Sequence, residues 1–449
     1  MKLIWGFDSS LLQTESFIFE GDIWFGERKS QSNVTYDILK LFKGKLDEFD
    51  RVSELGETMP DSFLVFFMKK LDWYMDMFDR TEFGRMSSYP LCRDYLILIG
   101  HLFYSLLEKK QIEYAFFISP PHFGVDAILA DICNFLNINV YYGYQSLFEN
   151  KFFVLDYRFS LLKPPTNGII NMPIPDVVHE RLFYMQQIKN KKILKISLLG
   201  VWIRILLGKV NALEFAYTYK KKKRQILFQE WQTKTEFLSG SIPQIEGVLK
   251  NIKYIYFPLH LQPEMTTSQL GGEWYRDQVA AINAILKILP LGWKIVIKEN
   301  PKQNWQYRSD AFLSSLLCDQ RILMAELGTP SKLLIQYSQL VATISGTVGW
   351  EAIRLNKPVI CLGKSWFASL HGVYKFKSDL DLEELSKKQI ESNELQASFN
   401  QLLSMSWQGV IDFNYQCLCS NFDFSENTKL IEKLFRDLPQ ASTVQHISF

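Results

Sequence analysis

The chain has 449 residues, 47% of them hydrophobic and 22% charged, with a formal net charge of +2. This length exceeds what one core normally holds, so we expect more than one domain, and the composition excludes a disordered protein. The near-neutral charge argues against a nucleic-acid partner. Six cysteines without paired metal-ligand spacing, and a start that lacks signal-peptide features, favour a reduced cytoplasmic protein with no metal site.

The first part of the chain, residues 1–175, alternates short apolar runs with helical stretches. Residues 115–119 and 139–142 are predicted strands, and residues 126–136 between them have the periodicity of an amphipathic helix. A strand, a helix and a strand in so short a span indicate a parallel sheet. We therefore predict an N-terminal α/β domain that ends in a proline-rich linker.

Residues 176–245 differ in composition, being basic and helical in pattern. The apolar run 193–209 is interrupted by Lys195 and Arg204 and flanked by lysines, so it is too short and too broken for a confident membrane span. It suits an amphipathic helix on an anionic membrane surface, and it equally suits a core-packing helix with a solvated basic flank. Both interpretations stay open, which leaves peripheral contact with the cytoplasmic membrane as one expectation.

From residue 246 to residue 385 the strand and helix rhythm returns, and we expect a second doubly wound α/β domain. The predicted strands are 254–257, 293–298, 340–344 and 358–362, and the predicted helices are 274–289, 330–337 and 348–355. Residues 386–449 read as mostly helical and are expected to pack back on the N-terminal domain. In this region Asp379-Leu-Asp381 opens a helical stretch, so it reads as a helix cap rather than a metal motif.

The strongest local signal is the turn Ser345-Gly346-Thr347, which follows a predicted strand and opens a helix containing Glu351. Backbone N–H groups at a helix N-terminus favour an anion, and the two hydroxyl groups can add hydrogen bonds to a phosphate. Glu351, one turn into the helix, is placed to accept hydrogen bonds from ribose hydroxyl groups. The same pattern also suits a capped helix with glycine for packing.

Two more groups of polar residues follow predicted strands of the same sheet. His260, Gln262 and Glu264 alternate with apolar residues, so they can project to one side of an extended loop. Lys298 and Asn300 follow the next strand, where a lysine offers a point charge for phosphate. Because strand ends of parallel sheets meet at one edge, the three loops are expected to converge on one ligand site.

The N-terminal domain offers a weaker set of candidates. His122 and Asp126 lie between a predicted strand and a predicted helix, where they would face the cleft from the opposite side. Asp126 reads as a base or nucleophile, or equally as a first-turn aspartate that interacts with the helix dipole. Asp8 and Ser9, at the end of the first predicted strand, are candidates of the same kind.

Taken together, the three C-terminal motifs resemble the bacterial capsule polysaccharide biosynthesis family, which includes retaining β-Kdo transferases. The residues that carry the resemblance are 259–264, 297–301, 345–352 and 357–359, with a looser match around residues 121–126 and 148–156. The resemblance implies a GT-B fold of two Rossmann-like domains, a CMP-linked sugar donor and no catalytic metal. One departure is that Asn300 stands where the family usually has a histidine.

By this analogy Ser345, Gly346, Thr347, Lys298, Asn300 and Gln262 would hold the donor phosphate and Glu351 the ribose. Asp126, Glu264 and His260 would be catalytic, and His122 and Asp8 would lie on the acceptor side. The expected activity is transfer of Kdo or a related ulosonic acid to a glycan or lipid-linked glycan, without a cofactor. A different nucleotide sugar, a polyol phosphate or a non-catalytic scaffold role remain alternatives.

Overall fold

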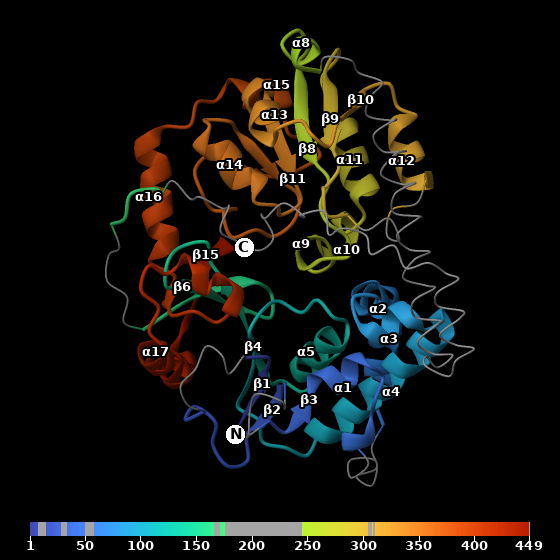
Figure 1. Ribbon diagram of the computed structural model, residues 1–449, viewed down its shortest axis with the longest axis vertical. Coiled ribbons are helices and arrows are strands. Elements are labelled where there is room, and N and C mark those ends of the chain that lie inside the picture. The colour runs from blue at the N-terminus through green and yellow to red at the C-terminus, as the bar shows by residue number, and fades with distance from the viewer. Residues whose placement is uncertain are drawn as a thin grey trace, which may run out of the picture.

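The computed structural model describes residues 1–7, 15–27, 34–49, 58–165, 171–175, 245–303, 308 and 310–448. Two separate β-sheets organise these residues, one of nine strands and one of six. Figure 1 shows the six-stranded sheet with its helices above the nine-stranded sheet. The α/β class predicted from the sequence is confirmed, and both sheets contain the parallel strands expected of doubly wound domains.

The six-stranded sheet is parallel throughout, with the spatial order β10-β9-β8-β11-β12-β13. In chain order this is 3-2-1-4-5-6, the doubly wound arrangement whose strand order reverses between the first and fourth strands. The reversal here lies between β8 and β11. The strands are β8 (Tyr254–Pro258), β9 (Lys294–Lys298), β10 (Ile322–Ala325), β11 (Leu340–Thr343), β12 (Val359–Cys361) and β13 (Val373–Lys375).

Helices cover both faces of this sheet, and successive residues of β8 show the alternation that results. Tyr254 and Tyr256 belong to one buried cluster, whereas Ile255 and Phe257 belong to another on the opposite face. The helices are α8 (Ile245–Leu249), α9 (Met265–Ser268), α10 (Gly272–Tyr275), α11 (Gln278–Leu286), α12 (Asp310–Leu317), α13 (Ser331–Tyr337), α14 (Val348–Arg354) and α15 (Leu382–Lys387).

One predicted helix of this domain is wrong in its extent. Residues 274–289 do not form a single helix, because α10 ends at Tyr275 and α11 begins at Gln278. Asp277 provides the physical reason, since its side chain accepts hydrogen bonds from the N–H groups of Val279 and Ala280 and so starts a new helix. By contrast, Asp381 caps α15 as expected, accepting from the N–H of Glu384.

The nine-stranded sheet has a parallel part in the order β3-β2-β1-β4-β5 and an antiparallel extension through β6 and β7. The strands are β1 (Lys2–Trp5), β2 (Ile23–Gly26), β3 (Tyr36–Asp37), β4 (Tyr114–Phe117), β5 (Asn139–Gln145), β6 (Lys151–Asp156) and β7 (Ser160–Lys163). The helices are α1 (Ile38–Phe42), α2 (Asp61–Phe78), α3 (Glu82–Met86), α4 (Tyr89–Leu107) and α5 (Val125–Phe135). The parallel unit predicted from β4, α5 and β5 is confirmed.

The end of the chain returns to this first sheet. It contains α16 (Ser392–Leu403), β14 (Trp407–Gln408), a 3-10 helix (Phe413–Leu418), α17 (Phe424–Asp437) and β15 (Ser442–Ser448). Strands β14 and β15 pair with β6 and β7, so the mostly helical pattern expected for this region missed two strands. Helix α17 packs on the sheet through Phe435, whose ring lies 5.5 Å from that of Phe116.

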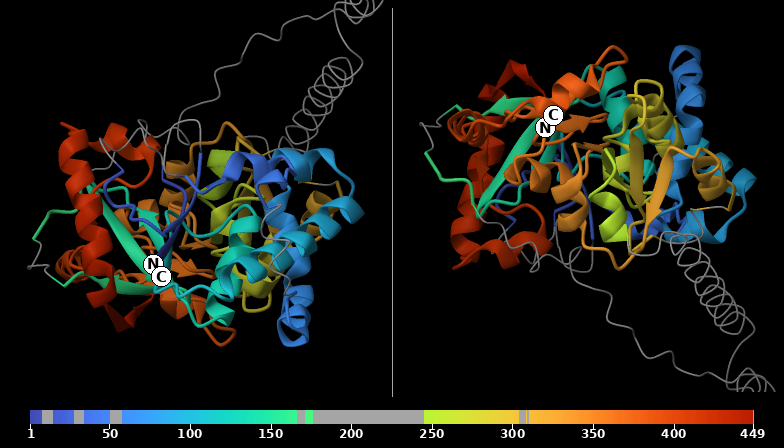
Figure 2. Two further views of the ribbon diagram at one scale, coloured as in Figure 1. Left: turned by 90° about the horizontal axis from the view of Figure 1, so that it is seen from below. Right: turned by 90° about the horizontal axis from the view of Figure 1, so that it is seen from above.

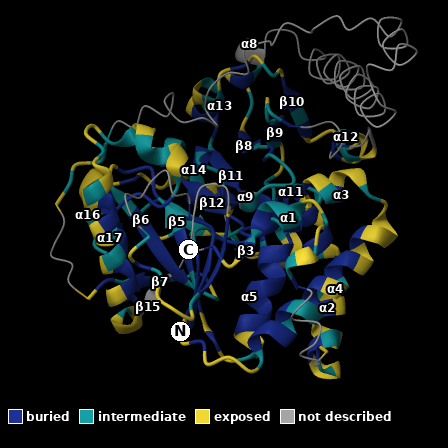
Figure 3. Cartoon of the chain, turned by 60° about the horizontal axis from the view of Figure 1, so that its bottom comes forward, coloured by how far each residue is buried: buried dark blue, intermediate teal, exposed yellow. Residues whose placement is uncertain are grey.

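The two faces of the first sheet are covered by different parts of the chain. In Figures 1 and 2, α16 and α17 lie on one side of the molecule and α2 to α4 lie on the other. Residues of β4 alternate accordingly: Ala115 and Phe117 join the core with α2, α4 and α5, whereas Phe116 joins the core with α17. Figure 3 shows the resulting pattern, with buried strands at the centre and exposed outer helix surfaces.

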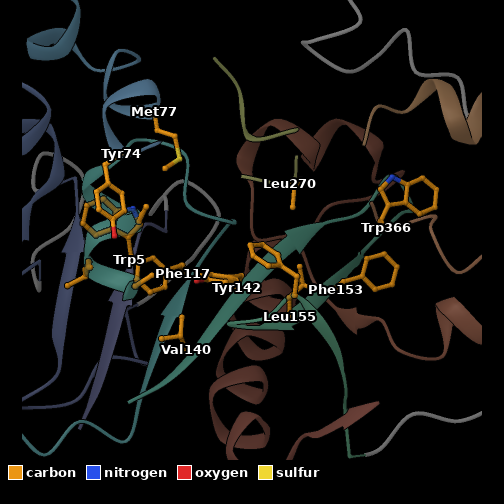
Figure 4. Packing of buried hydrophobic residues seen from close by; sticks show 14 of the residues in the cluster. Trp5, Tyr74, Met77, Phe117, Val140, Tyr142, Phe153, Leu155, Leu270 and Trp366 are labelled. Carbon is orange, nitrogen blue, oxygen red and sulfur yellow. The ribbon is translucent and has the colours of Figure 1, made fainter. Parts of the chain in front are cut away.

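A continuous apolar cluster joins the two α/β bodies. Figure 4 shows Phe153 and Leu155 of the first sheet in one cluster with Leu270 and Trp366 from the second body. Phe148 is 3% exposed, and its ring lies 5.5 Å from that of Trp366 and 6.2 Å from that of Trp350. The side chains of the first body are therefore part of the packing that supports α14.

Within the described residues, no helix is long and apolar enough to cross a membrane. The basic zone at 189–224, for which a membrane surface and a core position were both considered, lies outside the described residues, as do residues 176–244 in general.

Candidate functional site

Two of the three predicted loops meet where the strand order of the second sheet reverses. His260 follows β8 and is 6% exposed, and its Nε2 atom lies 3.1 Å from the N–H nitrogen of Gly346, which follows β11. The same Nε2 atom lies 3.0 Å from Thr343 Oγ1 and 3.4 Å from the backbone nitrogen of Ser345. The imidazole therefore ties the loop after β8 to the turn after β11.

This arrangement fixes the protonation state of His260. Burial, together with the nearby positive charge of Arg308, lowers its pKa to about 3. Nε2 then accepts hydrogen bonds from backbone N–H groups, as a neutral imidazole can. The sequence predicted an acid or base here, but in the structure His260 holds the turn at residues 345–346.

The turn at residues 345–347 leaves less space beside its backbone than the sequence implied. A Cβ atom at Gly346 would lie 2.9 Å from His260 Nε2, so the close approach of the two loops requires glycine at this position. The N–H of Gly346 also donates to Thr343 Oγ1 at 3.0 Å. The backbone donors of Ser345 and Gly346 that were assigned to phosphate thus point at protein atoms, and Thr347 stands at the N-cap position of α14.

A buried ion pair stabilises the loop after β8. Arg308, 2% exposed, donates from Nε to Glu299 Oε2 at 3.0 Å and from Nη2 to the carbonyl oxygen of His260 at 2.6 Å. Both side chains of the ion pair are fully buried. Glu299 also accepts from the N–H of Asn300 at 2.7 Å. Glu299 therefore stabilises the loop through these bonds and is not available to bind a ligand.

The loop is further held by a set of glutamine side chains. Gln262 accepts from Arg308 Nη1 at 3.2 Å and from Gln278 Nε2 at 3.0 Å, while Gln278 accepts from the N–H of His260 at 2.8 Å. Gln303 donates to the carbonyl oxygen of Gln262 at 2.8 Å. Gln262, predicted to bind the donor, is thus committed to the scaffold. Sequence reasoning missed Arg308, Gln278 and Gln303, because their partners lie far away along the chain.

Lys298 and Glu351 lie at the same edge of the sheet, close enough for their charges to interact. Burial lowers the pKa of Lys298 while the charge of Glu351 raises it, and burial raises the pKa of Glu351 while Arg354 and Lys298 lower it. Lys298 Nζ donates to the carbonyl oxygen of Thr329 at 2.6 Å. Both side chains are half-buried, so this edge offers both a cation and a carboxylate.

The other two candidates of this domain lie close by. Asn300 accepts from the N–H of Lys302 at 2.9 Å, which closes the turn after β9. Glu264 is half-buried and stands immediately before α9. The structure thus brings together His260, Gln262, Lys298, Asn300, Ser345, Gly346, Thr347 and Glu351 around the ends of β8, β9 and β11, with Glu264 at the end of the loop after β8.

In the N-terminal body, Asp126 is 2% exposed and engaged with the start of α5. Its carboxylate accepts hydrogen bonds from the N–H groups of His122, Phe123 and Ala127 at 2.8–2.9 Å. Burial raises its pKa to about 6, against the lowering effect of these bonds. His122 is held by the carbonyl oxygen of Pro120 at 2.8 Å, and burial lowers its pKa to about 3. This geometry matches the helix-dipole interpretation of Asp126.

We expect Asp126→Asn to keep near-normal turnover and to lower the free energy of unfolding by about 1 kcal/mol. The reason is that the amide NH₂ group cannot accept a hydrogen bond, so a backbone N–H at the start of α5 loses its partner. Turnover and chemical denaturation are measured on the same preparation. A loss of several orders of magnitude in turnover with unchanged stability would instead establish Asp126 as the nucleophile.

The remaining sequence candidates are Asp8 and Ser9, which lie outside the described residues. Within the parts of the chain that the structure describes, no group of three or more His, Cys, Asp or Glu residues is arranged to hold a metal ion.

Comparison with known proteins links the region of this site to one family. Residues 246–409 match the family model described as capsule polysaccharide biosynthesis protein. The resemblance drawn from the motifs is thereby confirmed for this part of the chain, which contains β8 to β13 and the loops of the candidate site. No functionally curated protein matches the chain in sequence.

Three solved structures show distant likenesses. The β-Kdo 2,4 transferase of Thermosulfurimonas dismutans KpsC is 10% identical, with a TM-score of 0.28, over 64% of this chain and 79% of that one. The β-Kdo 2,7 transferase of the same protein is 14% identical, with a TM-score of 0.29, over 73% and 94%. The UDP-GlcNAc 2-epimerase of Methanocaldococcus jannaschii is 11% identical, with a TM-score of 0.25, over 98% and 100%. At these values the likenesses carry no argument about function.

Proposed function

We propose that this protein is a glycosyltransferase of capsule or other surface-polysaccharide biosynthesis. In this proposal it transfers an acidic sugar, Kdo or a related ulosonic acid, from a CMP-linked donor to a glycan or lipid-linked glycan. Two findings support the proposal: the family match over residues 246–409, and a polar edge at the reversal point of a parallel sheet, where such sheets bind ligands.

The observation that carries the donor assignment is that Lys298 and Glu351 lie close enough at this edge for their charges to interact. A nucleotide sugar presents a phosphate and a ribose a short distance apart, and a cation beside a carboxylate matches these two groups. Lys298 is the last residue of β9, which pairs with β8. Glu351 lies in the first turn of α14, which follows β11, so regular structure holds both residues in place.

The chemistry of the acceptor requires a group that can remove a proton. His260 and Asp126 are both buried and hydrogen-bonded within the protein, so we assign this role to Glu264, which is half-buried beside the donor edge. We keep the expectation that transfer needs no catalytic metal. Asn300, in place of the family's usual histidine, has its side chain in the turn rather than free for phosphate, so Lys298 provides the positive charge.

The proposal is tested by nucleotide-induced thermal stabilisation with CMP, CDP, UDP and GDP. We expect CMP to raise the melting temperature most. Glu351→Ala should weaken CMP binding by about 1.5–3 kcal/mol, as expected for a lost hydrogen bond to a charged group, while the ligand-free melting temperature stays nearly unchanged.

The control is Glu383→Ala, because Glu383 is an exposed carboxylate at the start of α15, and this variant should bind CMP normally. Preference for UDP or GDP would retain the transferase but change its donor. Unaltered CMP affinity in a folded Glu351→Ala variant would remove the ribose assignment.

A non-catalytic scaffold role is the second candidate, and a specific observation favours it. Two of the three groups expected to perform catalysis, His260 and Asp126, are 6% and 2% exposed and serve the packing of loops. A scaffold of a polysaccharide assembly complex that retains the fold would show this pattern. It would respond to none of the four nucleotides.

A further inference from the structure

An arginine at the ligand edge of the N-terminal body lacks a full set of partners. Arg80 follows α2 and is only partly buried, yet its Nη1 atom is buried without a hydrogen-bond partner among the described residues. A buried guanidinium donor without a hydrogen bond costs free energy, so its presence calls for a functional explanation. The guanidinium carbon lies 5.2 Å from the centre of the Phe123 ring, which orients it.

The position of Arg80 is defined by the loop between β4 and α5. A Cβ atom at Gly124 would lie 2.5 Å from the carbonyl oxygen of Tyr74, so this loop packs directly on the last turns of α2. The loop follows the carboxyl end of β4, which is beside β1 at the point where the strand order of the first sheet reverses. Arg80 therefore stands at the edge where a doubly wound sheet takes its ligand.

The described groups closest to Arg80 leave its Nη1 donor without a hydrogen bond. The charge of Arg80 lowers the pKa of both His122 and Asp126, so it lies close to them. His122 is neutral, because burial lowers its pKa to about 3. The Asp126 carboxylate already accepts three backbone hydrogen bonds, so its lone pairs are directed at the start of α5. A bound oxyanion can therefore provide the hydrogen-bond acceptor that the described neighbouring residues do not give to Arg80 Nη1.

Helix α2, which precedes Arg80, contacts the second body. Asp76, one helical turn before Arg80 on α2, forms an ion pair with Arg276, and Trp73 donates to the carbonyl oxygen of Ser268. Helix α2 thus borders the junction between the two bodies. A ligand that binds at Arg80 would lie on the N-terminal side of that junction, opposite the body that carries Lys298 and Glu351.

We propose that Arg80, with Phe123 beneath it, binds an oxyanion of the acceptor, either a carboxylate of an acidic sugar or a phosphate. The assignment of this anion to an acceptor rests on the proposed function, whereas the anion site itself does not. A guanidinium offers paired N–H donors that match the geometry of both oxyanions. The proposal adds a second charged subsite, on the body opposite to the donor.

The test is the change in melting temperature with inorganic phosphate or glucuronate, each compared with sodium chloride at equal ionic strength. We expect one or both to raise the melting temperature of the wild type beyond chloride, and Arg80→Gln to lose that rise. Without anion, Arg80→Gln should be no less stable than the wild type, since it removes a guanidinium whose buried Nη1 donor has no hydrogen-bond partner in the described part of the chain. Arg93→Gln, an exposed arginine of the neighbouring α4, is the matched control and should respond as the wild type does.

The outcomes separate this site from the donor site. A response to glucuronate indicates a carboxylate on the acceptor, and a response to phosphate alone indicates a phosphate. A rise that is lost in Lys298→Ala but kept in Arg80→Gln would overturn the proposal, as would no rise beyond chloride in the wild type. CMP-induced stabilisation should persist in Arg80→Gln. If CMP has no effect on the wild type while the Arg80-dependent rise remains, the proposed function fails and the anion site stands.

Discussion

Arg308→Met is expected to lower the free energy of unfolding by about 3–5 kcal/mol, because removal of one partner of a buried ion pair leaves the other charge uncompensated. Arg308 and Glu299 are both fully buried, and Arg308 also donates to the carbonyl oxygen of His260. The variant would therefore leave the Glu299 carboxylate buried without its partner and would remove a hydrogen bond that holds the loop after β8. Denaturant-induced unfolding measures the loss.

Two further variants make the result specific. Arg321→Met removes an arginine paired with Asp319 at the surface, where the pair is worth about 0–1 kcal/mol, so it should change stability little. The double variant Glu299→Gln, Arg308→Met removes both charges and should recover part of the loss. Equal stability of Arg308→Met and Arg321→Met would contradict the role given to the buried pair.

The same variant should also change the candidate site. His260 ties the loop after β8 to Gly346, so a released loop loosens the turn that stands beside Glu351. We expect CMP affinity to fall in Arg308→Met even at temperatures where the protein remains folded. The effect is indirect, since Arg308 acts through His260 and Gln262 rather than by contact with a nucleotide.

Four of the six strands of the second sheet, β8, β9, β11 and β12, could be predicted from the sequence, because each is a short apolar run that ends at the sheet edge. Strands β10 and β13 were not predicted. Residues 254–257 and 340–344 were placed within one residue of β8 and β11. The convergence of loops followed from the rule that parallel strands present their carboxyl ends together. By contrast, β15 escaped prediction because its pairing with β7 depends on contacts almost 300 residues apart.

The direction of polar side chains could not be predicted in the same way. The alternation at His260 and Gln262 correctly implied that they project from a loop. It did not reveal that the imidazole accepts a hydrogen bond from the N–H of Gly346, 86 residues later. Likewise, Glu299 lay within a recognised motif, yet its partner Arg308 forms no local pattern with it. Sequence periodicity reports which side a residue faces, whereas the identity of its hydrogen-bond partner depends on tertiary contacts.

Phe148→Ala is expected to lower the free energy of unfolding by about 3–5 kcal/mol, the usual cost of removing a large buried aromatic side chain. Phe148 is 3% exposed and has edge contacts with Trp366 and with Phe399, whose ring is 5.1 Å away. Because these partners belong to the second body and to α16, the lost contacts are those that join the two α/β bodies. Differential scanning calorimetry should therefore show the unfolding transition separating into two.

The consequence for the site follows from Trp350, which stands next to Glu351 on α14 and has its ring 6.2 Å from that of Phe148. With the Phe148 ring removed, α14 loses part of its support, and CMP affinity should fall together with stability. Phe413→Ala, at a residue that is 46% exposed, is the matched control and should change neither quantity by more than about 0.5 kcal/mol. A Phe148→Ala protein that unfolds in one transition, with a stability loss as small as that of the control, would show that the two bodies are not coupled through this ring.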